Sequence, residues 1–122
     1  EVVALWRTPT GNEQASVTTG EQEGGEPTVA AIGFANADRD PADEMIVILT
    51  WPVQHYDVTG TLYDVRILDD ARPGQARLAE LEAISPRFDE HACDCDRRDE
   101  PPERFAFKTV AAVKAELTRL GF

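Results

Sequence analysis

The segment from His91 to Asp96 holds the residues best suited to binding a transition metal. Thiolate and imidazole groups suit zinc or copper, and alternate residues of an extended segment can face one ion. His91, Cys93 and Cys95 would supply three ligands of a tetrahedral site, with His55 or a carboxylate as the fourth. The spacing is not the Cys-x-x-Cys of structural zinc sites, nor that of iron–sulfur proteins. A small zinc or other transition-metal protein is therefore an alternative function, beside a surface loop with incidental thiols.

The same two cysteines allow a redox role, because cysteines one residue apart can close only a tight, strained and therefore labile disulfide ring. Asp94 and Asp96 flank the thiols, and their negative charge is expected to raise the thiol pKa and blunt nucleophilic attack. The neighbouring Arg97 and Arg98 offset this only in part. A catalytic cysteine is not predicted.

A second group of ligand-bearing residues lies between 36 and 44, where oxygen-bearing side chains alternate as they do in calcium loops. An EF-hand loop needs Gly at its sixth position and Glu at its twelfth. Counting from Asn36, these positions hold Pro41 and Val47, so the match fails at both. The segment is interpreted as a solvated turn between two strands, with a looser calcium or magnesium site as the alternative.

Hydrolytic and nucleotide chemistry find little support in the sequence. The nucleophile elbow, the dinucleotide fingerprint and the P-loop are all absent. His55 lies beside Tyr56 and Asp57, so a small enzyme with a His/carboxylate site is a further alternative. No catalytic residue is predicted, and a non-enzymatic role is favoured.

The charge excludes several classes of partner. The chain has 122 residues, with 12 basic against 23 acidic residues, for a net charge of −11. Residues 1–68 carry 11 acidic and 3 basic residues, a net charge of −8. Such a field repels phosphate and anionic lipid, so direct binding to nucleic acid or membrane is not expected. A GC-rich genome or a high-salt cytoplasm would also explain the acidity, but its concentration in one half favours a specific acidic face.

Apolar periodicity predicts mostly strands, followed by helix, strand and helix. The expected fold class is α+β: a mostly antiparallel sheet of four to six strands with two helices packed on one face. One domain covers 1–122, strand-rich over 1–68 and helix–strand–helix over 73–122, with an irregular acidic loop at 87–103. Strands are expected at 1–8, 15–19, 28–35, 45–49, 58–68 and 104–108, and helices at 73–84 and from a cap at Thr109 to about 120.

We therefore expect a non-enzymatic interaction or regulatory domain with an acidic face for a basic or nucleic-acid-binding protein, such as a nucleic-acid mimic or an assembly subunit. An aromatic residue would anchor the partner, although the aromatic loop after residue 50 could equally cover the end of the sheet. The expected partner-binding residues are Trp51, His55, Tyr56, Asp38, Asp40, Asp43 and Glu44. No cofactor is expected. The absence of an apolar run and of a signal peptide predicts a cytoplasmic protein, and the oligomeric state stays open.

Overall fold

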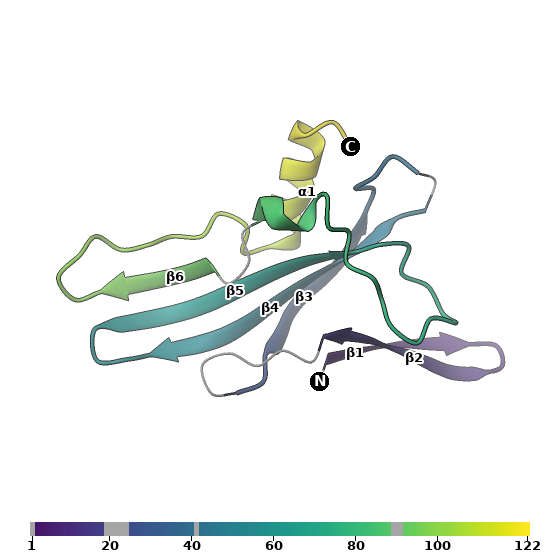
Figure 1. Ribbon diagram of the computed structural model, residues 1–122, viewed down its shortest axis with the longest axis horizontal. Helices are drawn as coiled ribbons and strands as arrows, with labels where there is room; N and C mark the ends of the chain where they lie inside the picture. The colour runs from purple at the N-terminus through teal and green to yellow at the C-terminus, as the bar shows by residue number, and fades with distance from the viewer. Residues whose placement is uncertain (1, 19–24, 41, 89–91) are drawn as a thin grey trace.

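The computed structural model describes residues 2–18, 25–40, 42–88 and 92–122. Within these ranges it is a mostly antiparallel structure of two sheets with one α-helix (Figure 1). The elements in chain order are β1 (Val2–Thr8), β2 (Gly11–Thr18), β3 (Thr28–Ala35), β4 (Glu44–Gln54), β5 (Val58–Leu68), a 3₁₀ turn η1 (Ser85–Phe88), β6 (Ala92–Arg97) and α1 (Val110–Arg119).

The larger sheet has the order β3-β4-β5-β6, with every neighbour antiparallel. Its centre is β4, which the continuous apolar run from Met45 to Leu49 predicts to be buried on both faces. Successive side chains of a strand point to opposite faces. Accordingly, Met45 and Val47 pack on one face and Ile46 and Ile48 on the other, so β4 contributes to two separate cores.

The hairpin β1–β2 covers one face of this sheet (Figure 1). Ala15 and Val17 of β2 are buried there against the Met45 face of β4. The backbone of Ser16 fixes the hairpin to a later segment, because it accepts from Leu78 N and donates to Ala76 O, both at 2.9 Å. The hairpin therefore forms a second layer.

The opposite face is covered by α1 and η1 (Figure 1). Three phenylalanines, Phe88, Phe105 and Phe107, pack on the same face. The predicted cap is confirmed, since Thr109 Oγ1 accepts from Ala112 N at 3.1 Å, and Val113 and Leu117 of α1 are buried. The helix lies close to β3 at Gly33, where a Cβ would overlap a methyl group of Val110. Glycine is required there by the close approach.

The prediction of a helix over 73–84 is wrong, and the described residues contain one helix rather than two packed on one face. The threefold spacing of Leu78, Leu81 and Ile84 is not one helical stripe. Leu78 packs in the core under the hairpin, whereas Leu81 and Ile84 pack in the core under α1. The backbone around residues 79–81 pairs with the end of β5 and the residue after it, as in Leu81 N to Ile67 O and Asp69 N to Ala79 O, both at 2.7 Å.

The region after residue 87 also differs from expectation. The loop expected to be irregular contains β6, which pairs with β5 from Tyr63↔Ala92 to Val58↔Arg97. The strand expected at 104–108 is not formed. Its alternation instead reflects the burial of Phe105, which packs against Phe107 with ring centroids 5.8 Å apart.

Candidate functional site

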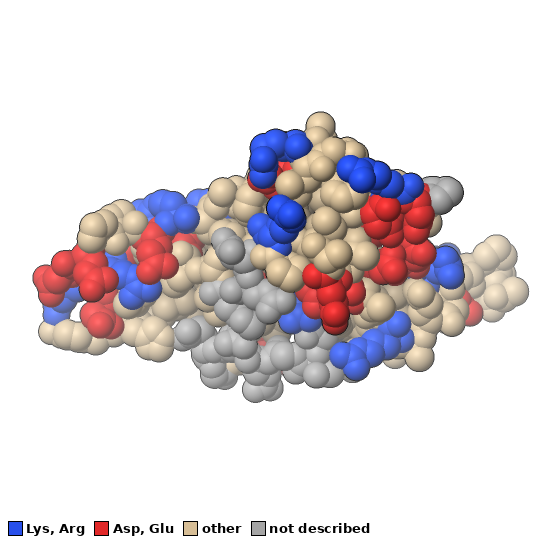
Figure 2. Space-filling view, turned by 45° about the horizontal axis from the view of Figure 1, so that its top comes forward, with Lys and Arg blue, Asp and Glu red and all other residues tan. Residues whose placement is uncertain are grey.

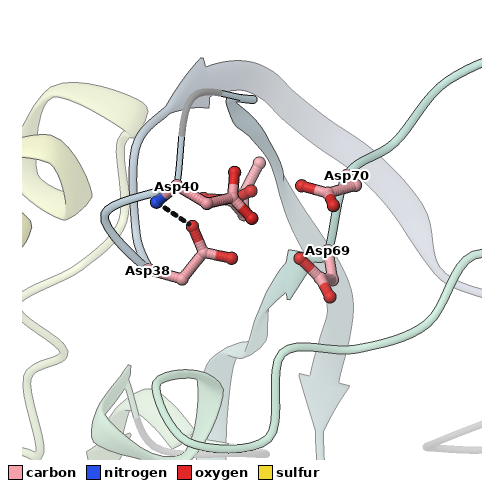
Figure 3. A group of neighbouring side chains, drawn as sticks. Asp38, Asp40, Asp69 and Asp70 are labelled. Atoms are coloured by element: carbon pink, nitrogen blue, oxygen red, sulfur yellow. Dashed lines mark hydrogen bonds between the residues drawn. The ribbon is translucent and has the colours of Figure 1, made fainter.

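Five carboxylates converge at one end of the larger sheet, and each offers an oxygen within 4.8 Å of all the others. They come from three places in the chain: the β3–β4 turn, the first residue of β4, and the connection that follows β5. The antiparallel register pairs Met45 with Leu68, which puts the start of β4 beside the end of β5. Figure 3 shows the turn and the connection facing each other. This carboxylate cluster consists of Asp38, Asp40, Glu44, Asp69 and Asp70.

Short hydrogen bonds hold the β3–β4 turn in shape. Asn36 Oδ1 accepts from Arg39 N at 2.6 Å, and Asp38 Oδ1 accepts from Asp40 N at 3.1 Å (Figure 3). Arg39 has a positive φ of 66°, which reverses the chain, and Asp70 on the facing connection has a φ of 45°. The side chain of Arg39 turns away from the cluster to Phe122, 4.9 Å above its ring. The backbone thus directs the aspartates toward the cluster.

Glu44 is the completely buried member of the cluster. Its Oε1 accepts from Ala37 N at 2.8 Å, but its Oε2 has no hydrogen-bond partner. Asp69 Oδ1 and Asp70 Oδ1 are likewise buried without a partner. Burial raises the pKa of Glu44 to about 7, with a smaller contribution from the charge of Asp38. Burial also raises the pKa of Asp69, and the charge of Asp70 adds to it. Three of the five carboxylates therefore each have one buried oxygen without a hydrogen-bond partner among the described residues.

The structure separates the residues expected to bind a partner. Trp51 is buried, so it is part of the core. His55 and Tyr56 are exposed in the β4–β5 turn, where the guanidinium of Arg98 lies 4.3 Å from the Tyr56 ring centre. Asp38, Asp40 and Glu44 lie at the other end of β4, an 11-residue strand about 33 Å long. The aromatic turn and the acidic turn therefore do not form one contact surface.

The structure also places Asp43 and the His55/Asp57 pair, which the sequence analysis considered as partner-binding and enzymatic residues. Asp43 is exposed on the acidic turn and lies outside the carboxylate cluster. His55 and Asp57, the residues of the enzymatic alternative, are both exposed on their turn. Figure 2 shows acidic side chains gathered in separate patches with basic side chains between them.

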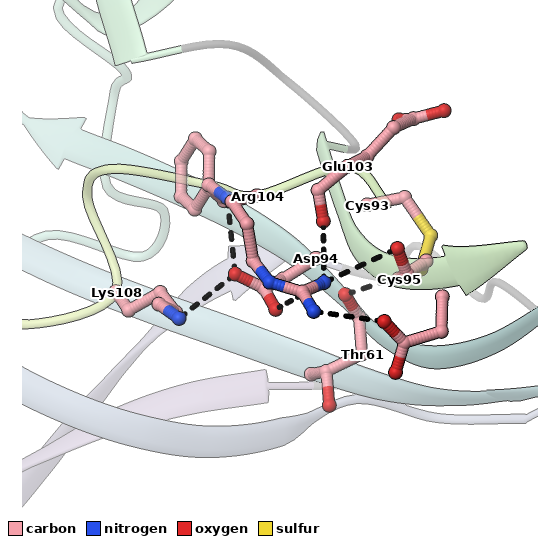
Figure 4. A network of polar contacts seen from close by, with 9 residues as sticks. Thr61, Cys93, Asp94, Cys95, Glu103, Arg104 and Lys108 are labelled. Atoms are coloured by element: carbon pink, nitrogen blue, oxygen red, sulfur yellow. Dashed lines mark hydrogen bonds and ion pairs between the residues drawn. A yellow bond between two sulfur atoms is a disulfide. The ribbon is translucent and has the colours of Figure 1, made fainter. Parts of the chain in front are cut away.

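Cys93 and Cys95 are joined in a disulfide on β6 (Figure 4). A disulfide sulfur is not a thiolate, so the pair offers no zinc ligand of that kind in the oxidised form. His91 lies outside the described residues. The hypothesis of a transition-metal site therefore applies to the reduced protein only.

Between the two cysteines, Asp94 is the centre of a polar network (Figure 4). Its carboxylate accepts from Phe105 N at 3.0 Å and pairs with Lys108 Nζ at 2.8 Å. The hydrogen bond from Lys108, followed by that from Phe105, lowers the pKa of Asp94. Arg104 adds a contact to Asp96 at 2.8 Å and donates to the carbonyl of Cys95. The network attaches the segment after β6 to that strand, which is a structural role.

An exposed apolar strip was missed by the sequence analysis, which treated 1–8 and 28–35 simply as strands. The strip runs along β1 and β3 beside a groove of about 260 Å³. Half-buried and exposed residues alternate along β1 and, from Ala31 onward, along β3. The signal in the sequence is that these strands have apolar residues at outward positions as well. The exposed members are Val3, Leu5, Val29, Ile32 and Phe34.

Comparison with known proteins gives no relative from which a role could be taken. No protein-family model matches the chain, and neither the curated proteins nor the solved structures yield a match. Within the described ranges, no helix has the length and apolar content that crossing a membrane requires. The fold and the two surfaces at the β3–β4 end, one acidic and one apolar, are therefore the basis for a functional proposal.

Proposed function

We propose that the chain is a non-enzymatic interaction domain that binds a basic, extended segment of a partner protein along β3 and the acidic turn that follows it. One observation carries this proposal: the exposed apolar strip ends at the carboxylates. Phe34 is the last exposed apolar residue of β3, and the acidic turn with Asp38 follows four residues later, so the apolar and acidic groups are adjacent along the chain. A single partner segment can contact both.

The apolar part of the surface has the properties of an anchor site. Ile32 is 57% exposed and Phe34 is 48% exposed, although both are large apolar side chains on a strand. Leu5 of β1 is 63% exposed across the groove. Contiguous exposed apolar residues rimmed by polar ones mark interaction surfaces, and aromatic residues are frequent energetic anchors.

The backbone of β3 favours an extended partner. Among the described strands, β3 is paired with β4 alone, so its other edge lies open in the larger sheet. An open edge presents unpaired N–H and C=O groups that another extended chain can match by strand addition. The alternating side chains of that added strand would meet Ile32 and Phe34.

Charge complementarity makes the partner segment basic. The turn that follows β3 carries Asp38, Asp40 and Asp43, with Arg39 as its basic residue. Lysine or arginine side chains of the partner would gain from this field, and added salt would screen the gain within a Debye length. In this proposal the partner is anchored by Ile32 and Phe34, and not by Trp51 and Tyr56 as the sequence suggested. The acidic residues of the turn keep the role that the sequence suggested.

The test is fluorescence anisotropy with a labelled peptide of alternating lysine and valine, titrated with the protein at low and high salt. Wild-type protein is expected to bind at low salt and to weaken steeply as salt rises. The double variant Ile32→Ser/Phe34→Ser should weaken binding by at least about tenfold, or 1.4 kcal/mol. Tyr56→Ser is the matched control, because Tyr56 is an exposed aromatic at the far end of β4.

Three results would contradict the proposal: wild-type protein that does not bind the peptide, an affinity that is independent of salt, or a double variant that binds like Tyr56→Ser. Circular dichroism of the double variant checks that the fold is kept, which is expected because both side chains are exposed.

A further inference from the structure

We propose that the carboxylate cluster at the β3–β4 end is a calcium-binding site. Its ligands are contributed by the β3–β4 turn, by the first residue of β4 and by the connection after β5. This inference does not depend on the partner-binding proposal, because it concerns a small ion held between backbone segments and not a protein on the surface. The residues are Asp38, Asp40, Glu44, Asp69 and Asp70.

The observation that points to a ligand is the state of Glu44. This side chain has no exposed surface, it offers an oxygen to the cluster, and its Oε2 has no hydrogen-bond partner. Leaving a buried polar atom unpaired is costly, and an ionised one more so. The neighbouring carboxylates cannot donate a hydrogen bond to Oε2 while they are ionised. A cation is the partner that satisfies all of these oxygens together.

Asp69 and Asp70 repeat the pattern on the facing connection. Each has one buried oxygen, Oδ1, without a hydrogen-bond partner, and each offers an oxygen to the cluster. Three carboxylates that each have one buried, unpartnered oxygen thus belong to one cluster, although they come from two separate segments; Figure 3 shows Asp69 and Asp70 facing the turn. Mutual repulsion of like charges would push these segments apart, whereas a divalent cation between them would bind them together.

The chemistry of the ligands selects a hard cation, and the geometry favours calcium. All five groups are carboxylates, which suit calcium, magnesium or manganese and not the softer metals. Calcium–oxygen distances of about 2.3–2.6 Å put oxygens on opposite sides of the ion about 4.6–5.2 Å apart. The ligand oxygens all lie within 4.8 Å of one another, which is compatible with this span. A magnesium shell spans only about 4.0–4.2 Å and demands near-octahedral order.

Hydrogen bonds around Asp40 restrict the turn that carries two of the ligands. Asp40 Oδ1 accepts from Ala42 N at 2.9 Å, and Asn36 Nδ2 donates to Asp40 O at 2.6 Å. These bonds restrict the turn before any ion arrives, so less conformational entropy is lost on binding. Water or bidentate coordination would complete the six to eight ligands of calcium.

The test is isothermal titration calorimetry of chelator-treated protein with calcium chloride, together with thermal unfolding with and without the ion. Wild-type protein is expected to bind one calcium ion per chain and to unfold at a higher temperature with calcium present. Glu44→Gln should weaken calcium binding by at least about tenfold and remove most of the thermal shift. Asp69→Asn, on the facing connection, is expected to do the same and covers the case in which Glu44→Gln does not fold.

Asp43→Asn is the matched control, because Asp43 is exposed on the same turn, lies outside the cluster and loses the same charge. It should bind calcium almost as wild-type protein does. The inference is overturned if wild-type protein shows neither binding heat nor a thermal shift at millimolar calcium. It is also overturned if Asp43→Asn loses as much affinity as Glu44→Gln, which would indicate a diffuse field, or if magnesium binds as tightly as calcium. Peptide binding measured in chelator is unaffected by these outcomes, so the two proposals fail separately.

Discussion

Replacing Glu44 by glutamine is expected to stabilise the metal-free protein at alkaline pH and to leave it nearly unchanged at acid pH. The carboxyl is completely buried, and burial raises its pKa from 4.5 to about 7. Glutamine has nearly the same size and keeps an oxygen that can accept from Ala37 N. It does not ionise, so it removes the titration without opening a cavity.

The direction of this pH dependence follows from which state, folded or unfolded, holds the Glu44 proton more tightly. The folded protein keeps the Glu44 proton up to about pH 7, whereas the unfolded chain loses it near 4.5. Between these values the folded state binds more protons, so its stability falls as pH rises. At about 1.36 kcal/mol per pH unit, the interval from pH 4.5 to about pH 7 lowers the stability of the folded protein by about 3 kcal/mol, and the loss is constant at higher pH.

The assay is urea denaturation of wild-type protein, Glu44→Gln and Asp43→Asn in chelator at about pH 5 and about pH 8. Glu44→Gln should exceed wild-type protein by less than about 1 kcal/mol at the lower pH and by about 3 kcal/mol at the higher one. Asp43→Asn, which removes an exposed charge, should stay close to wild-type protein at both. The reasoning is refuted if Glu44→Gln gains nothing between the two pH values, or if Asp43→Asn gains as much.

Three further predictions concern the packing and the network around β6. Gly33→Ala should lower the free energy of unfolding, measured by urea denaturation, by about 1–3 kcal/mol, because the added methyl would overlap Val110. Adding Val110→Ala should restore most of this loss, and a double variant without any recovery would contradict the close approach. The Cys93–Cys95 disulfide predicts no reaction with a thiol reagent in unfolded, unreduced protein and two thiols after reduction; a reactive thiol before reduction would refute it. Lys108→Met should destabilise the protein at neutral pH, because it removes the ion pair that lowers the Asp94 pKa. That difference should vanish as acid protonates Asp94 in the folded state, and a difference that persists in acid would argue against the ion pair.

Local patterns were sufficient to predict the central strands and the end of the chain. The apolar run from Met45 to Leu49 predicted β4, because a strand buried on both faces is apolar at every position. The alternation over 58–68 predicted β5, because a strand buried on one face is apolar at every second position. Thr109 and the stripe after it gave α1. The helix expected at 73–84 failed because a spacing of three does not show whether successive residues face one core or two. Here Leu78 and Leu81 enter different cores.

The candidate site was predictable only in part for the same reason. Asp38, Asp40 and Glu44 attracted attention through their alternation, and the EF-hand comparison was the wrong template because it expects all ligands in one loop. Asp69 and Asp70 join them only through the pairing of β4 with β5, a contact between distant parts of the chain. No local pattern encodes that register.

The most direct test of calcium binding at this end of the sheet is a nuclear magnetic resonance titration of ¹⁵N-labelled, chelator-treated protein with calcium. The account predicts that amide shifts change at the β3–β4 turn and after β5, including Asp40 and Asp70, and reach their limit at one ion per chain. Amides of the β4–β5 turn, such as Tyr56, should stay in place. Shifts that are absent, or that spread over the acidic surface without saturating, would contradict it.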